Sequence, residues 1–365
     1  MTHQALLETI IAARLYGPTD LRYERIRRPA LPDSRWVRVQ VQACAVCGTD
    51  REAFRSGPNL FRRSASAAPL TLGHEIIGRI IQTSADSIHD LGERVALDGN
   101  LGCMNCEECA ADRIHRCVEW EIVGLTVDGG LATELIVPDY TCIRVDDRVP
   151  TREAVLIEPL SVAVKAMRTL SAPASTSLLI NGAGAIGLLI VQAAIAQGVR
   201  DITCIDPDEN RRVLARRFGA THTLSPEQAA QQQVRTDSII ECSGAPTALG
   251  RAVRHLTPGG QLVAVGLSSE LTSLDAFDLV MNEKQVRGSV AHSLRGDFTT
   301  AAHYVNTGRV DLTAFPVHEI SFTSEALNTF THPDQTLRTA FIMDTDQSQH
   351  SSADSERVPT GIEAA

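Results

Sequence analysis

The 365-residue chain carries 44 acidic and 34 basic residues, a net charge of −10 at pH 7, with 43% hydrophobic and 21% charged residues. Acidic surfaces repel nucleic acids and anionic membranes, so neither is an expected partner. No apolar run approaches the roughly 18 residues of a membrane span, and the first eleven residues lack the features of a secretory signal. We expect a cytoplasmic protein of two domains, since single domains usually hold about 100–200 residues.

The first 150 residues are predicted to be mostly β. Apolar and polar residues alternate from Val37 to Val46, as in a half-buried strand, and the alternation stops at a turn beginning with Cys47-Gly48. Up to Pro150 the pattern stays strand-like but irregular, because Gly and Pro interrupt it often.

From Leu178 onward, short apolar runs alternate with segments of helical length. The runs are Leu178–Ile180, Ile202–Ile205, Ser238–Glu241 and Leu262–Val265, and the expected helices are Ile186–Ala196, Asn210–Phe218 and Ala248–His255. Strands buried on both faces that alternate with helices predict an α/β fold with a doubly wound parallel sheet. The regularity fades after Leu294, and a last strand is expected at Thr339–Met343.

A glycine-rich turn, Gly182-Ala183-Gly184-Ala185-Ile186-Gly187, follows the first of these runs and opens a helix. In this context a G-x-G-x-x-G pattern indicates a dinucleotide site, with Gly182 in the turn, Gly184 beside the pyrophosphate and Gly187 at the helix–strand contact. The phosphates would bind the helix N-terminus at Ala185 and Ile186. The alternative is a glycine-rich turn in an unrelated α/β sheet.

Asp206 ends the next predicted strand, where an acidic residue accepts hydrogen bonds from the adenosine ribose. A carboxylate there repels a 2′-phosphate, so NAD is favoured over NADP. Arg211 and Arg212 lie just beyond and are the candidates for holding such a phosphate, although their segment reads as an exposed helix face.

Four cysteines, Cys103, Cys106, Cys109 and Cys117, lie within fifteen residues. Four thiolates suit a closed, tetrahedral and therefore structural zinc site. An iron–sulfur cluster or free thiols are the alternatives, but the late spacing is wider than in ferredoxin-like runs and no Pro follows.

A second set of residues is scattered: Cys47-Gly48-Thr49-Asp50, Gly73-His74-Glu75 and Glu158-Pro159-Leu160. Together with the four-cysteine loop and the glycine-rich turn, in this order, the set resembles the zinc-containing medium-chain dehydrogenases over nearly the whole chain. The resemblance implies a GroES-like catalytic domain at residues 1–162 and 294–346 and a Rossmann domain at residues 163–293. The polar segment 347–365 is predicted to be a disordered tail.

The resemblance also implies a catalytic zinc bound by Cys47 and His74, with Glu75 and Glu158 as third and alternating fourth ligands. Thr49 matches the residue that starts the proton relay of the family. Glu52 stands where many relatives carry a relay histidine.

The string Cys-Gly-Thr-Asp-Arg-Glu is similar to that of archaeal-type glucose dehydrogenases, in which a glutamate at the position of Glu119 contacts sugar hydroxyls. Both Glu52 and Glu119 could equally be solvated loop carboxylates.

These features predict a zinc-dependent enzyme that uses NAD to oxidise a secondary hydroxyl on a polyol, sugar or cyclitol, or that reduces the ketone. The alternatives are an alcohol dehydrogenase, a threonine-type amino-alcohol dehydrogenase and, remotely, a non-catalytic member of the family. The family also implies a homodimer or homotetramer, commonly formed through the sheet edge near Val286–Val290.

Overall fold

A computed structural model describes residues 8–58, 69–170, 177–268, 270–331 and 336–343, and the backbone of residues 356–357. The chain divides into two compact units, Met1–Glu158 with Pro316–Ala365 and Pro159–Phe315. Apart from residues 356–357, the predicted tail lies outside the described residues. None of the helices in the described residues is long and apolar enough to cross a membrane.

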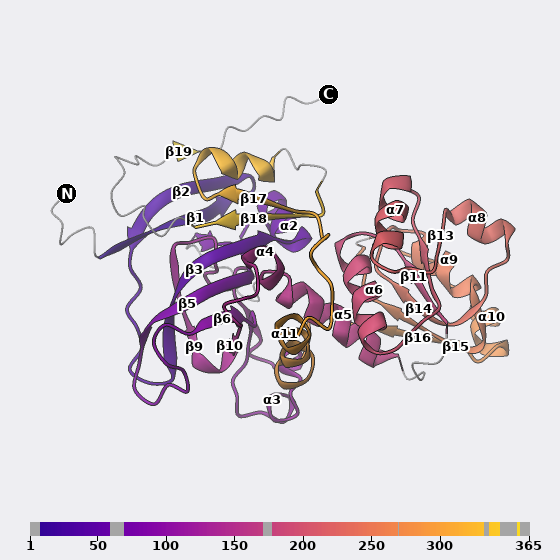
Figure 1. Cartoon of the computed structure of the whole chain (residues 1–365), viewed down its shortest axis with the longest axis horizontal. Helices are drawn as coiled ribbons and strands as arrows, with labels where there is room; N and C mark the ends of the chain where they lie inside the picture. The colour runs from indigo at the N-terminus through magenta and orange to yellow at the C-terminus, as the bar shows by residue number, and fades with distance from the viewer. Residues whose placement is uncertain are drawn as a thin grey trace. The chain divides into compact units, whose positions relative to one another are not determined.

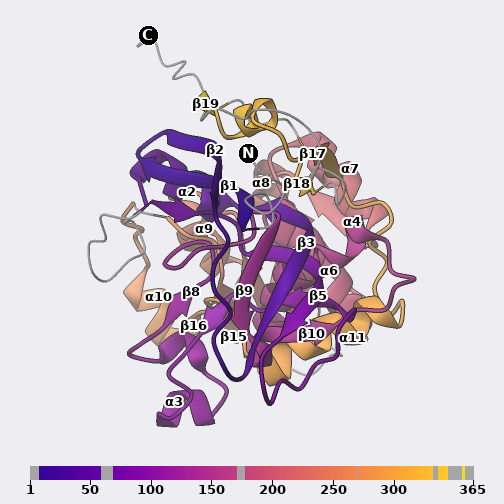
Figure 2. The same cartoon turned by 90° about the vertical axis from the view of Figure 1, so that its left-hand side faces the viewer.

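The first unit is mostly β, as predicted. Its strands are β1 (Thr9–Gly17), β2 (Asp20–Arg27), β3 (Trp36–Val46), β4 (Leu70–Thr71), β5 (Glu75–Thr83), β6 (Arg94–Leu97), β7 (Asn100–Leu101), β8 (Glu121–Ile122), β9 (Glu134–Pro138), β10 (Cys142–Arg144), β17 (Val317–Ser321), β18 (Arg338–Ile342) and β19 (Glu356–Arg357). The main sheet has the order β10-β6-β5-β3-β18-β17, with β9 also paired to β3, and a second sheet has the order β19-β2-β1-β4. Figure 2 shows β9, β3 and β5 side by side.

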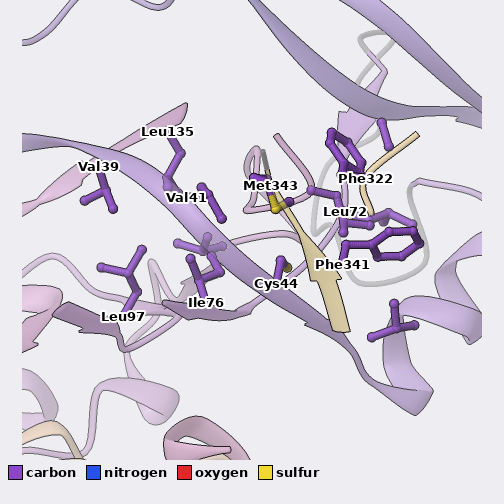
Figure 3. Close-up of a cluster of buried hydrophobic side chains, with 14 of the residues drawn as sticks. Val39, Val41, Cys44, Leu72, Ile76, Leu97, Leu135, Phe322, Phe341 and Met343 are labelled. Carbon is purple, nitrogen blue, oxygen red and sulfur yellow. The ribbon is translucent and has the colours of Figure 1, made fainter. Parts of the chain in front are cut away.

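The core of this unit lies on the main sheet. The predicted strand at Val37–Val46 is confirmed as β3, whose Val37, Val39 and Val41 are fully buried. The side chains around them include Ile76 of β5, Leu97 of β6, Leu135 of β9, Phe341 of β18 and Met343 just after β18 (Figure 3). Burying this apolar surface is the main stabilising contribution to such a sheet, and it fixes the ends of β3 and β5, where the candidate ligands begin.

The helices of the first unit are short. They are α2 (Gly48–Ser56), α3 (Glu107–Ala110), α4 (Thr151–Ala154), the start of α5 (Ile157–Thr169), the single turns η1 (Ile114–Arg116) and η2 (Asp139–Thr141), and the 3₁₀ helix η4 (Glu325–Phe330). Helix α2 follows β3 directly, with Cys47 as its N-cap residue and Asp50 at the third helical position bonded back to the Cys47 N–H. The turn expected at Cys47-Gly48 is therefore a strand-to-helix junction.

The second unit is the predicted doubly wound sheet. Its strands are β11 (Leu178–Asn181), β12 (Ile202–Ile205), β13 (His222–Leu224), β14 (Thr236–Glu241), β15 (Leu256–Ala264) and β16 (Gln285–Gly288). All neighbours are parallel, in the order β13-β12-β11-β14-β15-β16. This is the Rossmann order, in which two mononucleotide-binding halves meet between the first and fourth strands. The last residues of the strands are in register and form one edge: Leu224, Ile205, Asn181, Glu241, Ala264 and Gly288.

Helices cover both faces of this sheet (Figure 1). Besides the rest of α5, the helices of this unit are α6 (Ala185–Ala196), α7 (Glu209–Arg217), α8 (Pro226–Gln231), α9 (Ala248–Arg254), α10 (Ala276–Met281), the helical turn η3 (Leu294–Phe298) and α11 (Thr299–Asn306). Helix α6 is buried nearly all round, which explains why its sequence is apolar throughout.

The unit boundaries differ from those predicted at 162/163 and 293/294, the second of them substantially. Residues 294–315 belong with the second unit because they bond to it: Asp297 pairs with Arg168 at 2.8 Å, and Phe315 packs edge to face on Phe218. The buried residues Ala301, Ala302 and Val305 of α11 have helical spacing. This helical periodicity is visible in the sequence after Leu294 and contradicts the expected loss of regularity there.

Candidate active site and cofactor site

Cys47, His74 and Glu75 come together at the ends of two neighbouring strands. Cys47 follows β3, Glu75 begins β5, and Ala45 of β3 pairs directly with Glu75. One ligand atom from each of the three side chains lies within 4.8 Å of the other two. A thiol, an imidazole and a carboxylate at this separation suit zinc, which accepts sulfur, nitrogen and oxygen ligands.

Asp50 organises two of these three residues. It is fully buried; its Oδ2 accepts the Cys47 N–H at 2.8 Å, and its Oδ1 accepts the Gly73 N–H at 3.2 Å. The same Oδ1 lies 3.3 Å from Nδ1 of His74, so Nε2 is the ring nitrogen left for a metal. This role of Asp50 was not among the predictions from the sequence, although the residue lies inside the Cys47 motif.

Arg338 is the cation of the site, and no sequence motif predicted it. It begins β18, and its NH2 lies 3.0 Å from Oε1 of Glu75 in a buried ion pair. The geometry is that of an ion pair and not of a hydrogen bond, so neither Glu75 oxygen has a hydrogen-bond donor among the described residues. A buried carboxylate whose two oxygens both lack a hydrogen-bond donor fits the role of a metal ligand.

The charges of the site act on one another. Burial raises the pKa of Glu75 well above its ordinary value, which Arg338 opposes and Cys47 and Glu158 reinforce. Burial also disfavours the Cys47 thiolate, but Arg338 and His74 outweigh it and lower the pKa of Cys47 to about 6. Glu158, in the first turn of α5, lies outside the triple of ligand atoms but within reach of its electrostatic field.

Thr49 lies beside the same triple. Its Oγ1 is 3.4 Å from Nε2 of His74, the nitrogen that faces away from Asp50. The hydroxyl is thus placed where a group bound to the metal would be within its reach.

The four-cysteine loop folds into a closed cluster. The sulfur atoms of Cys103 and Cys117 are 3.5 Å apart, those of Cys106 and Cys117 3.8 Å, and those of Cys103 and Cys109 4.0 Å. A tetrahedral site with zinc–sulfur bonds of about 2.3 Å has sulfur atoms about 3.8 Å apart. The N–H of Asn105, the largest cause, and the neighbouring thiols lower the pKa of Cys103 to about 7, whereas burial raises the pKa of Cys109 to about 12. The cluster therefore fits a structural zinc ion.

The glycine-rich turn is shaped for close backbone contacts. Gly182 has φ +104°, and a Cβ atom there would lie 2.9 Å from the backbone of Ser243. A Cβ atom at Gly187 would lie 2.0 Å from the carbonyl oxygen of Gly182, whereas one at Gly184 would meet open space. Two glycines are thus needed for packing, and the third leaves room at the N-terminus of α6, the location of a phosphate in this fold.

Residues 33–147 match the alcohol dehydrogenase GroES-like domain family, and residues 185–307 match the zinc-binding dehydrogenase family. The chain is 27% identical over 323 residues to sorbitol dehydrogenase 1 of Saccharomyces cerevisiae, covering 84% of this chain and 90% of that enzyme. It is 29% identical over 295 residues to L-threonine 3-dehydrogenase of Thermococcus kodakarensis, covering 78% and 83%. A solved zinc-binding dehydrogenase from Sinorhizobium meliloti bound to NADP has a TM-score of 0.83 and 26% identity, covering 92% and 99%.

The chain belongs to the zinc-dependent medium-chain dehydrogenase family. It is an oxidoreductase of the alcohol and polyol dehydrogenase type, with zinc and a nicotinamide dinucleotide as cofactors. The predicted fold, a GroES-like unit and a Rossmann unit, is confirmed.

This dehydrogenase holds Glu52 and Glu119 at exposed positions. The Glu52 side chain is 52% exposed, accepts a hydrogen bond from Ser56 at 2.9 Å and lies 3.6 Å from Arg55 of the same helix. Glu119 follows the four-cysteine loop, and its N–H donates to the Cys117 sulfur. Neither side chain belongs to the triple of ligand atoms, so their roles in proton transfer and sugar binding stay predictions.

At the other cofactor position, Asp206 is buried and turned toward the glycine-rich turn. Its Oδ2 accepts the Ala183 N–H at 2.8 Å, and its Oδ1 accepts the Asp208 N–H at 2.9 Å. Arg212 donates to the carbonyl oxygens of Asp206 and Pro207, whereas the side chain of Arg211 is exposed.

Proposed function

We propose that this dehydrogenase uses NAD to oxidise a secondary hydroxyl on a polyol, sugar or cyclitol. The observation that carries the proposal is the buried Glu75 carboxylate, which lacks hydrogen-bond donors among the described residues and lies beside Cys47 and His74. Cys47, His74 and Glu75 would hold the zinc, with Glu158 as the alternating ligand. When bound there, zinc supplies Lewis-acid chemistry that lowers the pKa of a hydroxyl group.

The residues of the chain supply positioning and proton transfer. Asp50 fixes the imidazole of His74 with Nε2 toward the ligand site, because its Oδ1 faces Nδ1. Arg338 balances the negative charge that Cys47 and Glu75 bring into a buried place. Thr49 accepts the proton of the substrate hydroxyl through its own hydroxyl group and passes it on, with Glu52 as the candidate next acceptor.

The polyol substrate class has support from the ligand set and from the relatives. A site with two glutamates, Glu75 and Glu158, beside one cysteine is the set that the family resemblance associates with polyol and sugar dehydrogenases. One of the relatives is a sorbitol dehydrogenase. The threonine dehydrogenase among them favours an amino alcohol as the second candidate.

The choice of NAD rests on Asp206. Its carboxylate lies against the glycine-rich turn, where a ribose 2′-phosphate would be repelled. Exchanging Asp206 for Ser is expected to raise kcat/KM with NADP relative to NAD by at least about tenfold. An unchanged ratio contradicts the assignment.

The substrate proposal is tested with a panel of sorbitol, xylitol, glucose, myo-inositol, 2,3-butanediol, ethanol and L-threonine, followed by NADH absorbance. We expect the highest kcat/KM with a polyol, sugar or cyclitol. Faster turnover of ethanol would assign a simple alcohol dehydrogenase, and faster turnover of L-threonine would assign the amino-alcohol alternative. Absence of NAD reduction with every compound contradicts the proposal.

A further inference from the structure

A strained loop leaves the carboxyl edge of the parallel sheet. It comprises residues 290–293 and follows β16 after Ser289, whose N–H donates to the Ala264 carbonyl oxygen and extends the ladder by one residue. Within this 290–293 loop, Ala291 has φ +52°, in the left-handed region that residues with a Cβ atom rarely adopt. Such a conformation persists only where the surroundings impose it, and strain of this kind clusters at functional sites.

Two cations of helix α5 hold the loop on both sides of Ala291. On one side Lys165, which is buried, donates from Nζ to the carbonyl oxygen of Val290 at 2.6 Å. On the other side Arg168, one helical turn later, makes a two-point ion pair with Asp297, each bond 2.8 Å long.

Asp297 transmits that attachment to the loop. It is fully buried, and its Oδ2 accepts both the N–H of Ser293 at 2.9 Å and the hydroxyl of Ser293 at 2.8 Å. Between the two attachments, His292 is buried and stacks on Phe298 with ring centroids 5.3 Å apart. The loop is therefore fixed before Ala291 by Lys165, after it by Arg168 through Asp297, and in the middle by packing.

The position of the loop indicates what it faces. In the strand order of this sheet, the glycine-rich turn after β11 and Asp206 after β12 belong to the half that binds the adenosine part of a dinucleotide. The strands β14, β15 and β16 form the other half. The loop after β16 therefore lies at the edge that receives the nicotinamide nucleotide.

We propose that Lys165 and Arg168 are positioning residues that clamp the 290–293 loop in the conformation that receives the nicotinamide half of the cofactor. The inference rests on the dinucleotide site of the proposed function and not on the substrate. A preformed loop lowers the cost of binding, because the apparent affinity falls with the fraction of molecules in the competent conformation.

The chain offers a matched control, because it contains only two lysines, Lys165 and Lys284. The side chain of Lys284 is 2% exposed, lies in the same unit and also donates to a backbone carbonyl, that of Val253. It precedes β16, however, and so lies at the amino end of the strand, away from the cofactor edge. If a buried ammonium group only stabilised the fold, replacing either lysine would change NADH binding to the same extent.

The test measures binding of NADH and of ADP-ribose by titration calorimetry for the full chain and for the variants Lys165→Met and Lys284→Met. ADP-ribose contains the adenosine half without the nicotinamide, so it reports on the other half of the site alone. We expect Lys165→Met to weaken NADH binding about tenfold and to leave ADP-ribose binding within about twofold. Lys284→Met should change neither by more than about twofold.

Equal weakening of both ligands by Lys165→Met, or no weakening of NADH binding, overturns the inference. If Lys165→Met does not fold, Arg168→Met is the second variant, because Asp297 then still accepts the N–H and the hydroxyl of Ser293. Arg168→Met should likewise weaken NADH binding more than ADP-ribose binding. A wild-type chain that binds neither NADH nor NADPH contradicts the proposed function itself, and that outcome is distinct from a selective failure of the clamp.

Discussion

Asp50 and His74 lie 3.3 Å apart, carboxylate Oδ1 to imidazole Nδ1, and the same aspartate accepts the backbone N–H of Cys47. One buried carboxylate thus positions two of the three candidate zinc ligands. Carboxylates that orient a ligating histidine typically contribute about 10–100-fold to metal affinity.

Exchanging Asp50 for Asn should lower the zinc affinity of the site formed by Cys47, His74 and Glu75 about 10–100-fold and leave the four-cysteine site intact. Competition with a chelator, followed by zinc release, measures this directly. Asp146→Asn is the control, because Asp146 pairs with Arg148 in a loop and belongs to neither group of candidate ligands. Equal zinc retention in the two variants would show that Asp50 does not support the ligands.

Removing the hydroxyl of Thr49 should slow turnover by about 10²–10⁴-fold, the usual contribution of a group that transfers a proton. Zinc content should not change, because Thr49 lies 3.4 Å from His74 without being one of the three ligands. Kinetics of Thr49→Ala and Thr49→Ser measure the effect, and the serine variant should keep most of the activity. Full activity of the alanine variant removes Thr49 from the mechanism.

The four-cysteine cluster should stabilise the first unit and not take part in the reaction. Cys106→Ala breaks the cluster, so we expect the loss of one zinc per chain and a thermal midpoint lower by several degrees, since structural zinc contributes folding energy. Cys142→Ala is the control, because Cys142 is a buried cysteine of β10 outside the cluster. Loss of zinc from the control as well would contradict this assignment.

The attachment at Asp297 should weaken in acid. Burial disfavours its charged form, but Arg168 and Ser293 outweigh that effect and hold the pKa of Asp297 below the ordinary 3.8. A group with a depressed pKa contributes stability above its unfolded pKa, and this contribution is lost as the pH falls through the folded value.

Wild type should therefore melt about 2–4 °C above Asp297→Asn at pH 7, the shift expected for about 1 kcal/mol in a unit of this size. Thermal midpoints measured between pH 7 and pH 3 check this, and the difference should shrink below about pH 4. A difference that grows in acid would contradict a depressed pKa of Asp297.

The second unit should self-associate through α10 and the edge of β16. In the described residues β16 pairs only with β15, and the nearby side chains of Leu267, Phe277, Val280 and Met281 are 64–76% exposed. An apolar surface of this kind next to an open strand edge favours contact with a second copy. In light scattering, the double variant Phe277→Glu with Val280→Glu should be a monomer. The control variant Leu91→Glu changes an exposed position in the first unit and should remain a dimer or tetramer. A monomeric wild type contradicts the prediction.

Much of the fold could be predicted from the sequence because its signals are local. The alternation at Val37–Val46 and the apolar runs between Leu178 and Val265 each specify a strand without reference to distant residues. Strand β16 gives no such signal, because it lies at the sheet edge and its residues are mostly exposed. The boundary near Leu294 was misplaced because Asp297 and Phe315 bind partners more than 90 residues away.

The site could be predicted only in part for the same reason. Cys47, His74 and Glu75 belong to short motifs, whereas Arg338 reaches Glu75 through the pairing of Thr339 with Val46, a contact that no local pattern reveals. The available sequence signal is an arginine directly before the apolar strand that was predicted at Thr339–Met343. Asp50 could have been found, because an aspartate at the third position of a helix bonds back to the N-cap residue.

The central claim is that Cys47, His74 and Glu75 hold a catalytic zinc separate from the structural one. It is tested most directly by measuring zinc per chain and NAD reduction together in wild type and in Cys47→Ser. We expect two zinc ions and polyol oxidation for wild type, and one zinc ion with no measurable turnover for the variant. A Cys47→Ser variant that keeps two zinc ions and full activity would contradict it.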